Sequence, residues 1–189
     1  MKRRTLLSVG LAGVLAAAFP SVSLAASKAE QRAEVRQNAQ SILKQLYKTN
    51  PSARGLIENA AGYATFSNFG MKILLLGGGT GQGLAVDRES GKETFMKMME
   101  VQGGLGFGVK KFRLVFVFET KEALRRFIDS GWESSAQATL AATDGRHGAA
   151  YQGAVPISPG VWLFQLTDKG LAAEATIKGT RYYKDDSLN

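Results

Sequence analysis

Residues 77–83 read Gly-Gly-Gly-Thr-Gly-Gln-Gly, and residues 104–108 read Gly-Leu-Gly-Phe-Gly. Side chains along a β-strand point alternately to the two faces of the sheet, so each stretch, as a strand, has one face almost without side chains. An interior glycine costs roughly 0.5–1 kcal/mol relative to alanine. A repeated stripe therefore indicates sharp curvature of the sheet or close approach of another element. The predicted structural glycines are Gly77, Gly79, Gly81, Gly83, Gly104, Gly106 and Gly108.

Apolar segments on both sides of the glycines complete a predicted sheet. Gly91 marks a turn that joins residues 84–87 to residues 94–99 as a hairpin. Residues 112–118 form a predicted strand, and its continuous apolar part, 114–118, is typical of a strand buried on both faces. With further strands at 62–66 and 71–76, we expect a meander of short strands.

The C-terminal third of the chain also reads as strands, separated by turn residues. Pro156, Pro159 and the segment 168–170 interrupt the pattern, and Asp185-Asp186 is expected in a solvated tail. The predicted strands here are 132–142, 150–155, 161–167 and 171–183.

Three helices are predicted around this sheet. The first, Ser27 to Thr49, ends at Asn50-Pro51 because proline disfavours the helical region for the residue before it. A short helix follows at 52–59, and Thr120 can cap a third helix that ends at Gly131. The predicted fold is α+β, with a strongly curved, mostly antiparallel, barrel-like sheet, a long N-terminal helix and one or two shorter helices.

The first helix is amphipathic and admits two interpretations. Its apolar stripe is suited to packing on the sheet, or to lying on an anionic membrane, since basic residues flank a modest apolar face. The stripe consists of Val35, Ala39, Ile42, Leu43 and Leu46, and Arg32, Arg36, Lys44 and Lys48 lie mostly outside it.

Composition indicates one globular domain with a basic surface. The 189 residues are 44% apolar and 21% charged, with a formal charge of +8. That charge favours anionic partners such as phospholipid surfaces, nucleic acid or acidic polymers, without choosing among them. The absence of cysteine excludes disulfides and a lipid-modified cysteine anchor.

The N-terminus has the pattern of an export signal. Lys2, Arg3 and Arg4 precede an apolar run from Leu6 to Phe19, and small residues before Ala26 predict cleavage after Ala25. The run is shorter than the roughly 20 residues that a membrane-spanning helix needs. Cleavage removes three basic residues and no acidic one, which lowers the formal charge from +8 to +5.

The export signal predicts that the protein is exported and that the chain has three segments. The segments are a signal peptide at 1–25, the amphipathic helix at 26–50 and a folded domain at 51–189. Arg3-Arg4-Thr5-Leu6-Leu7 also resembles a twin-arginine signal, so the Sec and twin-arginine routes both stay open. The expected location is periplasmic or exported, with peripheral membrane association.

No pattern for catalysis, nucleotide or metal is present. Nucleotide-binding glycines lie between a strand and a helix, whereas here residues 84–87 continue as a strand. His147 is the only histidine and lies in a polar loop without a nucleophile elbow elsewhere. The hairpin carboxylates lack the spacing of a metal loop. We expect no enzyme activity, no cofactor and no bound metal.

Basic residues give the more specific lead. Lys110, Lys111 and Arg113 lie at the junction of two predicted strands, 101–109 and 112–118, and Arg125 and Arg126 follow in the next helix. They are either solvated surface charges or contacts to lipid phosphates, where each contributes about 1 kcal/mol near an anionic surface. Lys44 and Lys48 on the first helix join them as candidate lipid-binding residues, and export argues against nucleic acid.

Several motifs together resemble the SYLF family of lipid-binding domains. They are the run Ala61-Gly62-Tyr63-Ala64-Thr65-Phe66, the glycine-rich strands, residues 114–118 leading into Thr120, Ala123 and Leu124, and the closing Gly170-Leu171 and Ile177-Lys178-Gly179. The resemblance covers roughly residues 50–189. The family often has a proline after the equivalent of Phe66, whereas this chain has Ser67.

The resemblance implies membrane association without catalysis. The predicted function is peripheral binding to anionic phospholipid in a bacterial envelope. The alternative is an envelope scaffolding protein whose basic surface binds another protein, and an enzyme ranks third.

Overall fold

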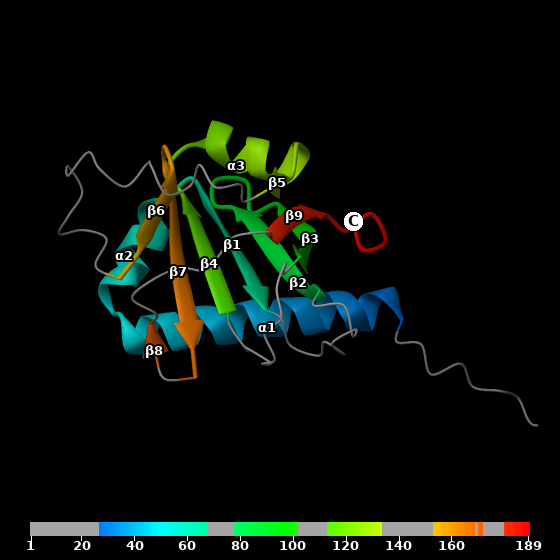
Figure 1. Ribbon diagram of the computed structural model, residues 1–189, viewed down its shortest axis with the longest axis horizontal. Coiled ribbons are helices and arrows are strands. Elements are labelled where there is room, and N and C mark those ends of the chain that lie inside the picture. Colours follow the sequence, from blue (N-terminus) through cyan, green and yellow to red (C-terminus); the bar gives the residue numbers. More distant parts are fainter. Residues whose placement is uncertain (1–26, 68–77, 102–112, 134–152, 169, 172–179) are drawn as a thin grey trace, which may run out of the picture.

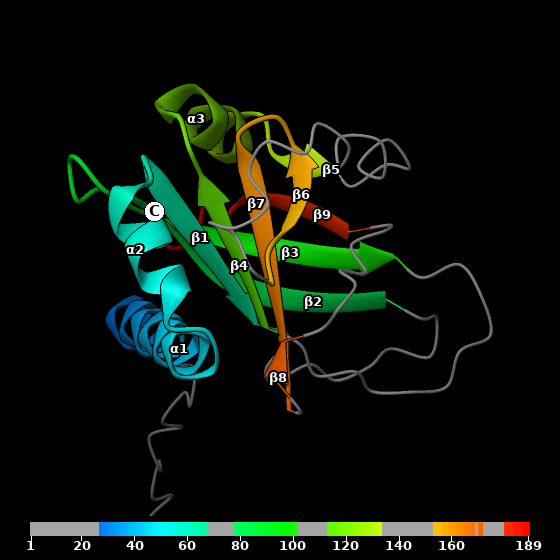
Figure 2. The same cartoon turned by 90° about the vertical axis from the view of Figure 1, so that its left-hand side faces the viewer.

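The computed structural model describes residues 27–67, 78–101, 113–133, 153–168, 170–171 and 180–189. Within these ranges three helices lie against one antiparallel sheet that curls into a half-barrel (Figures 1 and 2). The α+β prediction is confirmed. The helices are α1 (Lys28–Thr49), α2 (Ser52–Asn59) and α3 (Lys121–Asp129). The strands are β1 (Gly62–Ser67), β2 (Gly78–Asp87), β3 (Glu93–Val101), β4 (Arg113–Phe118), β5 (Trp132–Glu133), β6 (Val155–Ser158), β7 (Val161–Thr167), β8 (Gly170–Leu171) and β9 (Thr180–Lys184).

Local sequence signals set the helix ends as predicted. The Ser27 hydroxyl accepts a hydrogen bond from the Glu30 amide at 3.2 Å, and the Glu30 carboxylate accepts one from the Ser27 amide at 2.6 Å, so α1 begins with a capping box. Asn50 caps its C-terminal end. Thr120 caps α3 through the Ala123 amide, and Gly131 follows α3 with a φ of +66°.

The strand order is β5-β9-β3-β2-β1-β4-β7-β6, with β8 paired to β7. The expected simple meander is therefore wrong beyond β3, because β4 lies between β1 and β7 and not beside the predicted strand that precedes it in the chain, 101–109. Apolar side chains fill both faces of β4, and Leu114 to Phe118 are all at most 1% exposed. Such a strand needs covering on both sides, which only the middle of the sheet provides.

Pro156 also differs from the prediction, since it lies inside β6 instead of ending a strand. β6 is the last strand in the sheet order. Proline is tolerated on an edge strand because its missing N–H deprives no neighbouring strand of a hydrogen bond.

Helices cover opposite faces of the central strands. Phe116 and Phe118 of β4 pack with Leu124 and Phe127 of α3, together with Tyr182. On the other face, Val115 and Val117 pack with residues of α1 and α2.

A third cluster joins the N-terminal half of α1 to β2 and β3 through Val35, Ala39, Leu84, Phe95 and Leu188. The sheet is thus held between α3 on one side and α1 with α2 on the other (Figure 1).

Other residues of this chain fill the space beside Gly81 and Gly83 of β2. A methyl group on Gly83 would meet the Phe66 ring at 2.3 Å and the Thr65 carbonyl oxygen at 2.5 Å. One on Gly81 would meet the Ser67 carbonyl oxygen at 2.5 Å and the Met98 side chain at 3.0 Å. The occupants are therefore Phe66 and Met98 in the cluster beneath α3, and not a helix laid across the strand. Gly79 continues the same strand opposite Glu100, whereas Gly77, Gly104, Gly106 and Gly108 lie outside the described residues.

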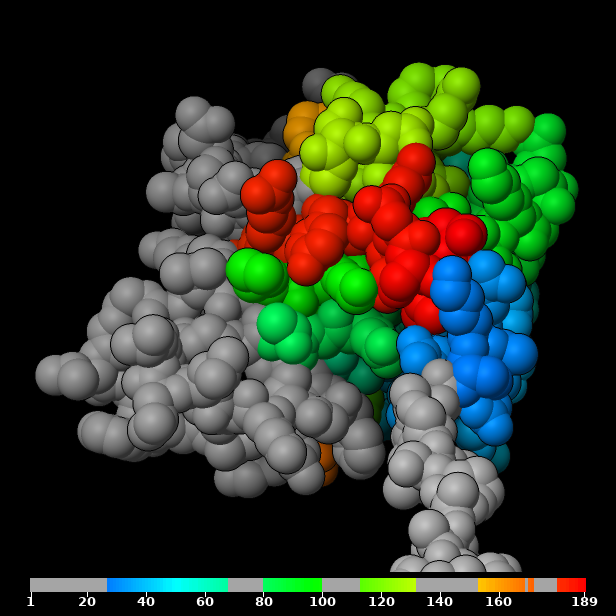
Figure 3. Space-filling model, turned by 90° about the vertical axis from the view of Figure 1, so that its right-hand side faces the viewer, coloured from blue at the N-terminus to red at the C-terminus, as the bar shows by residue number. Residues whose placement is uncertain are grey.

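The C-terminal residues pack against α1 and β3, and the expected solvated tail is wrong for Asp185. Its side chain is 2% exposed, and its carboxylate pairs with Lys97 at 2.8 Å. The Asn189 side chain bonds to the Phe95 backbone in both directions, at 2.9 and 2.8 Å. Arg32 of α1 donates to the Leu188 carbonyl at 2.6 Å. Figure 3 shows these residues beside the N-terminal half of α1.

Candidate functional site

The apolar stripe of α1 is buried against the sheet. Val35, Ala39, Ile42 and Leu46 are each at most 4% exposed, and Leu43 is partly buried in the cluster shared with α2. Of the two interpretations of this helix, the structure supports the one in which it packs on the sheet. The helix therefore presents its polar side outwards, apart from the partly exposed Leu43 and Tyr47.

The basic residues of α1 divide into two groups. Arg36 pairs with Glu93 at 2.7 Å, and the guanidinium groups of Arg32 and Arg36 lie 5.7 and 5.1 Å from the centre of the Phe95 ring. These two arginines fix the helix to β3. Lys44 and Lys48 are exposed and pair with no acidic residue in the described ranges.

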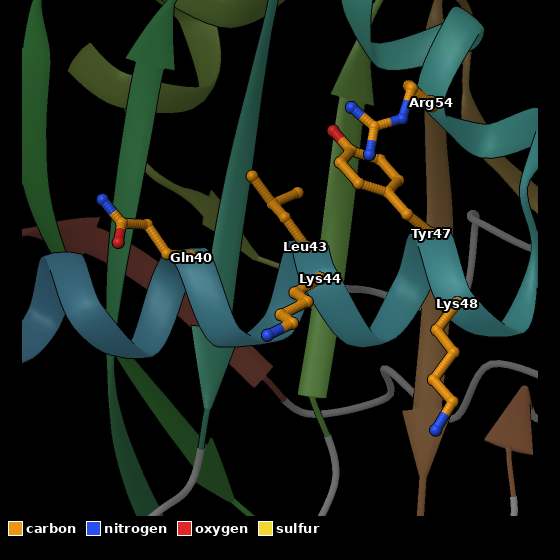
Figure 4. Close-up of a pocket in the computed structure, with 6 residues that line it drawn as sticks. All are labelled: Gln40, Leu43, Lys44, Tyr47, Lys48 and Arg54. Carbon is orange, nitrogen blue, oxygen red and sulfur yellow. The ribbon is translucent and has the colours of Figure 1, made fainter.

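Lys44 and Lys48 line a shallow surface groove with a volume of about 430 Å³. The lining residues are Gln40, Leu43, Lys44, Tyr47, Lys48 and Arg54. Tyr47 and Arg54 lie together on one side of α1, and Lys44 and Lys48 extend to the other side (Figure 4). The groove therefore combines three cationic groups with the apolar surface of Leu43 and Tyr47.

Arg54 reaches the groove because the chain turns at Asn50-Pro51. α2 begins at Ser52, beside the C-terminal end of α1, which places the Arg54 guanidinium 4.4 Å from the centre of the Tyr47 ring. A cation over an aromatic face is attracted by the negative face of the ring. Arg54 also lies 3.6 Å from the Glu58 carboxylate, one turn along α2.

Tyr47 of the groove and Tyr63, which packs against the same hydrophobic cluster, both stay protonated at neutral pH. Burial raises the pKa of the Tyr47 phenol, and the nearby Tyr63 adds to that increase, while Arg54 opposes it. Burial also raises the pKa of Tyr63, against the opposing charge of Arg88. Both hydroxyls are therefore neutral groups that can donate a hydrogen bond to an anion.

The other predicted lipid-binding residues do not join this groove. Arg125 and Arg126 are exposed on α3, across the sheet from α1, and Arg125 pairs with Glu122 at 3.2 Å. Arg113 at the start of β4 lies 3.5 Å from Asp168. Lys110 and Lys111 lie outside the described residues, and their lipid contact stays a prediction.

Sequence reasoning missed Arg54 and Tyr47. Tyr47 falls between the two lysines along the helix, and a proline-marked helical turn separates it from Arg54. A tight turn between two consecutive helices brings their adjoining ends together, and Asn50-Pro51 marked that turn in the sequence.

In the described part of the chain, no helix is long and apolar enough to cross a membrane. Nor do three metal-ligating side chains gather anywhere within those same ranges.

The described ranges thus form a domain of the α+β class, in which a curled antiparallel sheet is backed by helices and an open basic groove lies on the surface. The model of a protein family described as "Ysc84: Las17-binding protein actin regulator" matches residues 99–189. The chain belongs to this family, the SYLF family, as its motifs predicted.

A relative described as beta cell expansion factor A, from Aeromonas veronii, supports this membership. It is 33% identical over 159 residues, which make up 84% of this chain and 59% of the relative. The chain thus spans about three-fifths of the length of the curated relative that it matches.

Proposed function

We propose that this chain is a non-catalytic lipid-binding protein of the bacterial cell envelope that associates peripherally with anionic phospholipid. The observation that carries the proposal is the groove of Lys44, Lys48 and Arg54 beside Leu43 and Tyr47. Cations beside partly exposed apolar and aromatic groups suit the boundary between lipid headgroups and acyl chains.

The surrounding sequence keeps this groove cationic. No aspartate or glutamate occurs between residues 35 and 57, a stretch that contains Lys44, Lys48 and Arg54. At about 1 kcal/mol for each basic residue near an anionic surface, these three cations supply about 3 kcal/mol. That amount gives weak, reversible attachment, so further contacts from the rest of the domain contribute to binding.

The proposed mode of attachment is peripheral because α1 keeps its apolar stripe in the protein core. Moving that stripe into a membrane would expose the apolar face of β4 and β7 to water. Headgroup contact through the outer side of α1 and α2 leaves the core intact. The proposed location, periplasmic or exported after cleavage near Ala25, rests on the basic and apolar pattern of residues 1–25.

The alternative is an envelope scaffolding protein that binds another protein through its basic surface. The description of the matching family model, which names binding to a protein, favours this second candidate.

Vesicle sedimentation with residues 26–189, which contain every described residue, separates the two candidates. We expect binding to vesicles that contain phosphatidylglycerol, no binding to pure phosphatidylcholine, and weaker binding as salt rises. The physical reason is that the screening length falls from about 10 Å at 0.1 M salt to about 3 Å at 1 M. Failure to bind any lipid composition would contradict the lipid proposal and leave the scaffolding candidate.

A further inference from the structure

The two halves of α1 pack in two separate hydrophobic clusters. Ile42 and Leu46, in the second half of the helix, belong to the cluster shared with α2. Val35 and Ala39, in the first half, belong to a smaller cluster, whose other buried members are Leu84, Phe95 and Leu188. The first half therefore has few apolar contacts, and one of them comes from Leu188, a residue that follows β9.

A polar cavity lies under the middle of α1. It has a volume of about 10 Å³ and is lined by apolar residues from both halves of the helix and by the polar residues Asn38, Thr65, Ser67 and Gln82. Thr65 is 1% exposed, and its hydroxyl has no hydrogen-bond partner among the described residues. A volume of roughly 10–15 Å³ with two to four polar partners suits one water molecule. This hydrated position interrupts the apolar packing along α1 between the two clusters.

Residues 185–189 hold the first half of α1 against the sheet. The Leu188 side chain is buried in the smaller cluster, and the Leu188 carbonyl accepts the hydrogen bond from Arg32. The Asn189 side chain holds the same segment on β3 through its two hydrogen bonds with the Phe95 backbone. Residues 185–189 thus lie beside both α1 and β3 (Figure 3) and connect the two.

The remaining contacts of the first half are accessible to water. The side chains of Arg36 and Glu93 are 43% and 33% exposed, and exposed ion pairs contribute little to stability. Val35 and Ala39 are also smaller than Ile42 and Leu46, and stabilisation by burial grows with the apolar area removed from water. The first half of α1 is therefore held less firmly than the second half.

We propose that residues 28–39 of α1 and residues 185–189 form a separable unit, which opens while the second half of α1 stays on the sheet. Proteins open in cooperative units, whose free energies range from near zero to that of global unfolding. Opening uncovers Leu84 and Phe95, so residues 185–189 act as a latch over an apolar surface of β2 and β3. This inference goes beyond the proposed function, because Lys44, Lys48 and Arg54 lie outside the unit that opens.

Hydrogen exchange of residues 26–189 without lipid tests the inference, under conditions in which exchange rates report opening equilibria. In the wild type, we expect amides 33–39 to exchange at least about tenfold faster than amides 43–46. Low concentrations of urea should accelerate amides 33–39 less than amides 43–46. The reason is that partial opening exposes less surface than global unfolding, and the effect of urea scales with the exposed surface.

Two substitutions, one in each cluster, distinguish partial opening from global unfolding. Ile57→Val shortens a buried side chain of the cluster shared with α2. It should accelerate amides 43–46 about fivefold and leave amides 33–39 unchanged, because Ile57 stays packed when only the first half opens. Leu188→Ala should accelerate amides 33–39 about 30-fold, because the contact of Leu188 is lost in the open form.

Equal acceleration of both segments by Ile57→Val would overturn the inference, because α1 would then open only with the whole domain. An unchanged rate of amides 33–39 in Leu188→Ala would overturn the role of residues 185–189 as a latch. Thermal unfolding verifies that each variant folds, and the milder Ile57→Val decides the inference if Leu188→Ala does not fold. These experiments contain no lipid, so failure of vesicle binding would contradict the proposed function and leave this inference standing.

Discussion

Gly83 of β2 has no side chain, and this leaves room for a side chain of the neighbouring strand β1. Its register partner on β1 is Phe66, whose ring lies where a Cβ at position 83 would be. Phe66 then packs edge-to-face with Phe116 and Tyr182 at centroid distances of 5.7 and 4.8 Å. The glycine thus admits an aromatic ring into the core.

Gly83→Ala should therefore destabilise the fold by about 3 kcal/mol, because neither the Phe66 ring nor the Thr65 carbonyl oxygen can move freely. Gly55→Ala is the matched control: in α2 nothing lies within 4 Å of an added Cβ. There the change should stabilise the protein by about 0.5–1 kcal/mol, as expected for alanine in a helix. Urea unfolding measures both free energies, and an equal effect at the two positions would contradict this packing account.

Asp185 is the residue whose titration links stability to pH. Burial favours its neutral form, but hydrogen bonds from Lys97 and Ser187 and the Lys97 charge outweigh that effect, so the pKa of the carboxyl lies below its usual 3.8. A lowered folded-state pKa means that the ionised form stabilises the native state at neutral pH. This contribution diminishes as pH falls below about 3.8 towards the folded-state value.

Asp185→Asn should reduce the free energy of unfolding at pH 7 by about 1–3 kcal/mol, because it leaves Lys97 without its acidic partner. The variant should also lose less stability than wild type as pH falls below 3.8, the ordinary carboxyl pKa. Unfolding measured from pH 7 to pH 2 gives both results. Parallel curves for the two proteins would show that Asp185 does not contribute to the pH dependence.

At the scale of single elements, α1 has a structural side and an exposed side. Its buried stripe contacts two separate hydrophobic clusters, and Arg32 and Arg36 fasten its first half to Leu188 and Glu93. Lys44 and Lys48 remain on the exposed side of the second half. Removing α1 would therefore unfold the domain, so deletion cannot test whether the helix binds lipid.

Hydrogen exchange tests the two sides of α1 directly. We expect amides from Val35 to Leu46 to keep their protection when the protein binds phosphatidylglycerol vesicles, because the apolar stripe stays on the sheet. Phosphatidylcholine vesicles serve as the control. Loss of protection in this segment on binding would mean instead that α1 leaves the sheet to enter the membrane.

Elements with strong local signals could be predicted from the sequence. Ser27, Asn50, Thr120 and Gly131 each mark a helix end by their own chemistry, and the structure confirms those ends. Strand neighbours could not be predicted in the same way. The pairing of β4 with β1, and of β9 with β3, depends on which faces need covering over the whole sheet.

At the scale of the whole molecule, the sheet separates two basic surfaces. Lys44 and Lys48 lie with Arg54 on the side of α1 and α2, whereas Arg125 and Arg126 lie on α3 across the sheet. The sequence indicated these four residues as candidates but not their separation, because only the tertiary fold assigns residues to opposite sides. Arg54 became part of the site for the same reason.

This separation provides the most direct test of lipid binding at the groove. The measurement is the affinity of residues 26–189 for phosphatidylglycerol vesicles, in two charge-matched double variants. Lys44→Gln with Lys48→Gln should weaken binding about 30-fold, from two losses of about 1 kcal/mol each. Arg125→Gln with Arg126→Gln should change binding less than about threefold. Equal weakening by both pairs, or greater weakening by the α3 pair, would contradict the assignment of lipid binding to the groove between α1 and α2.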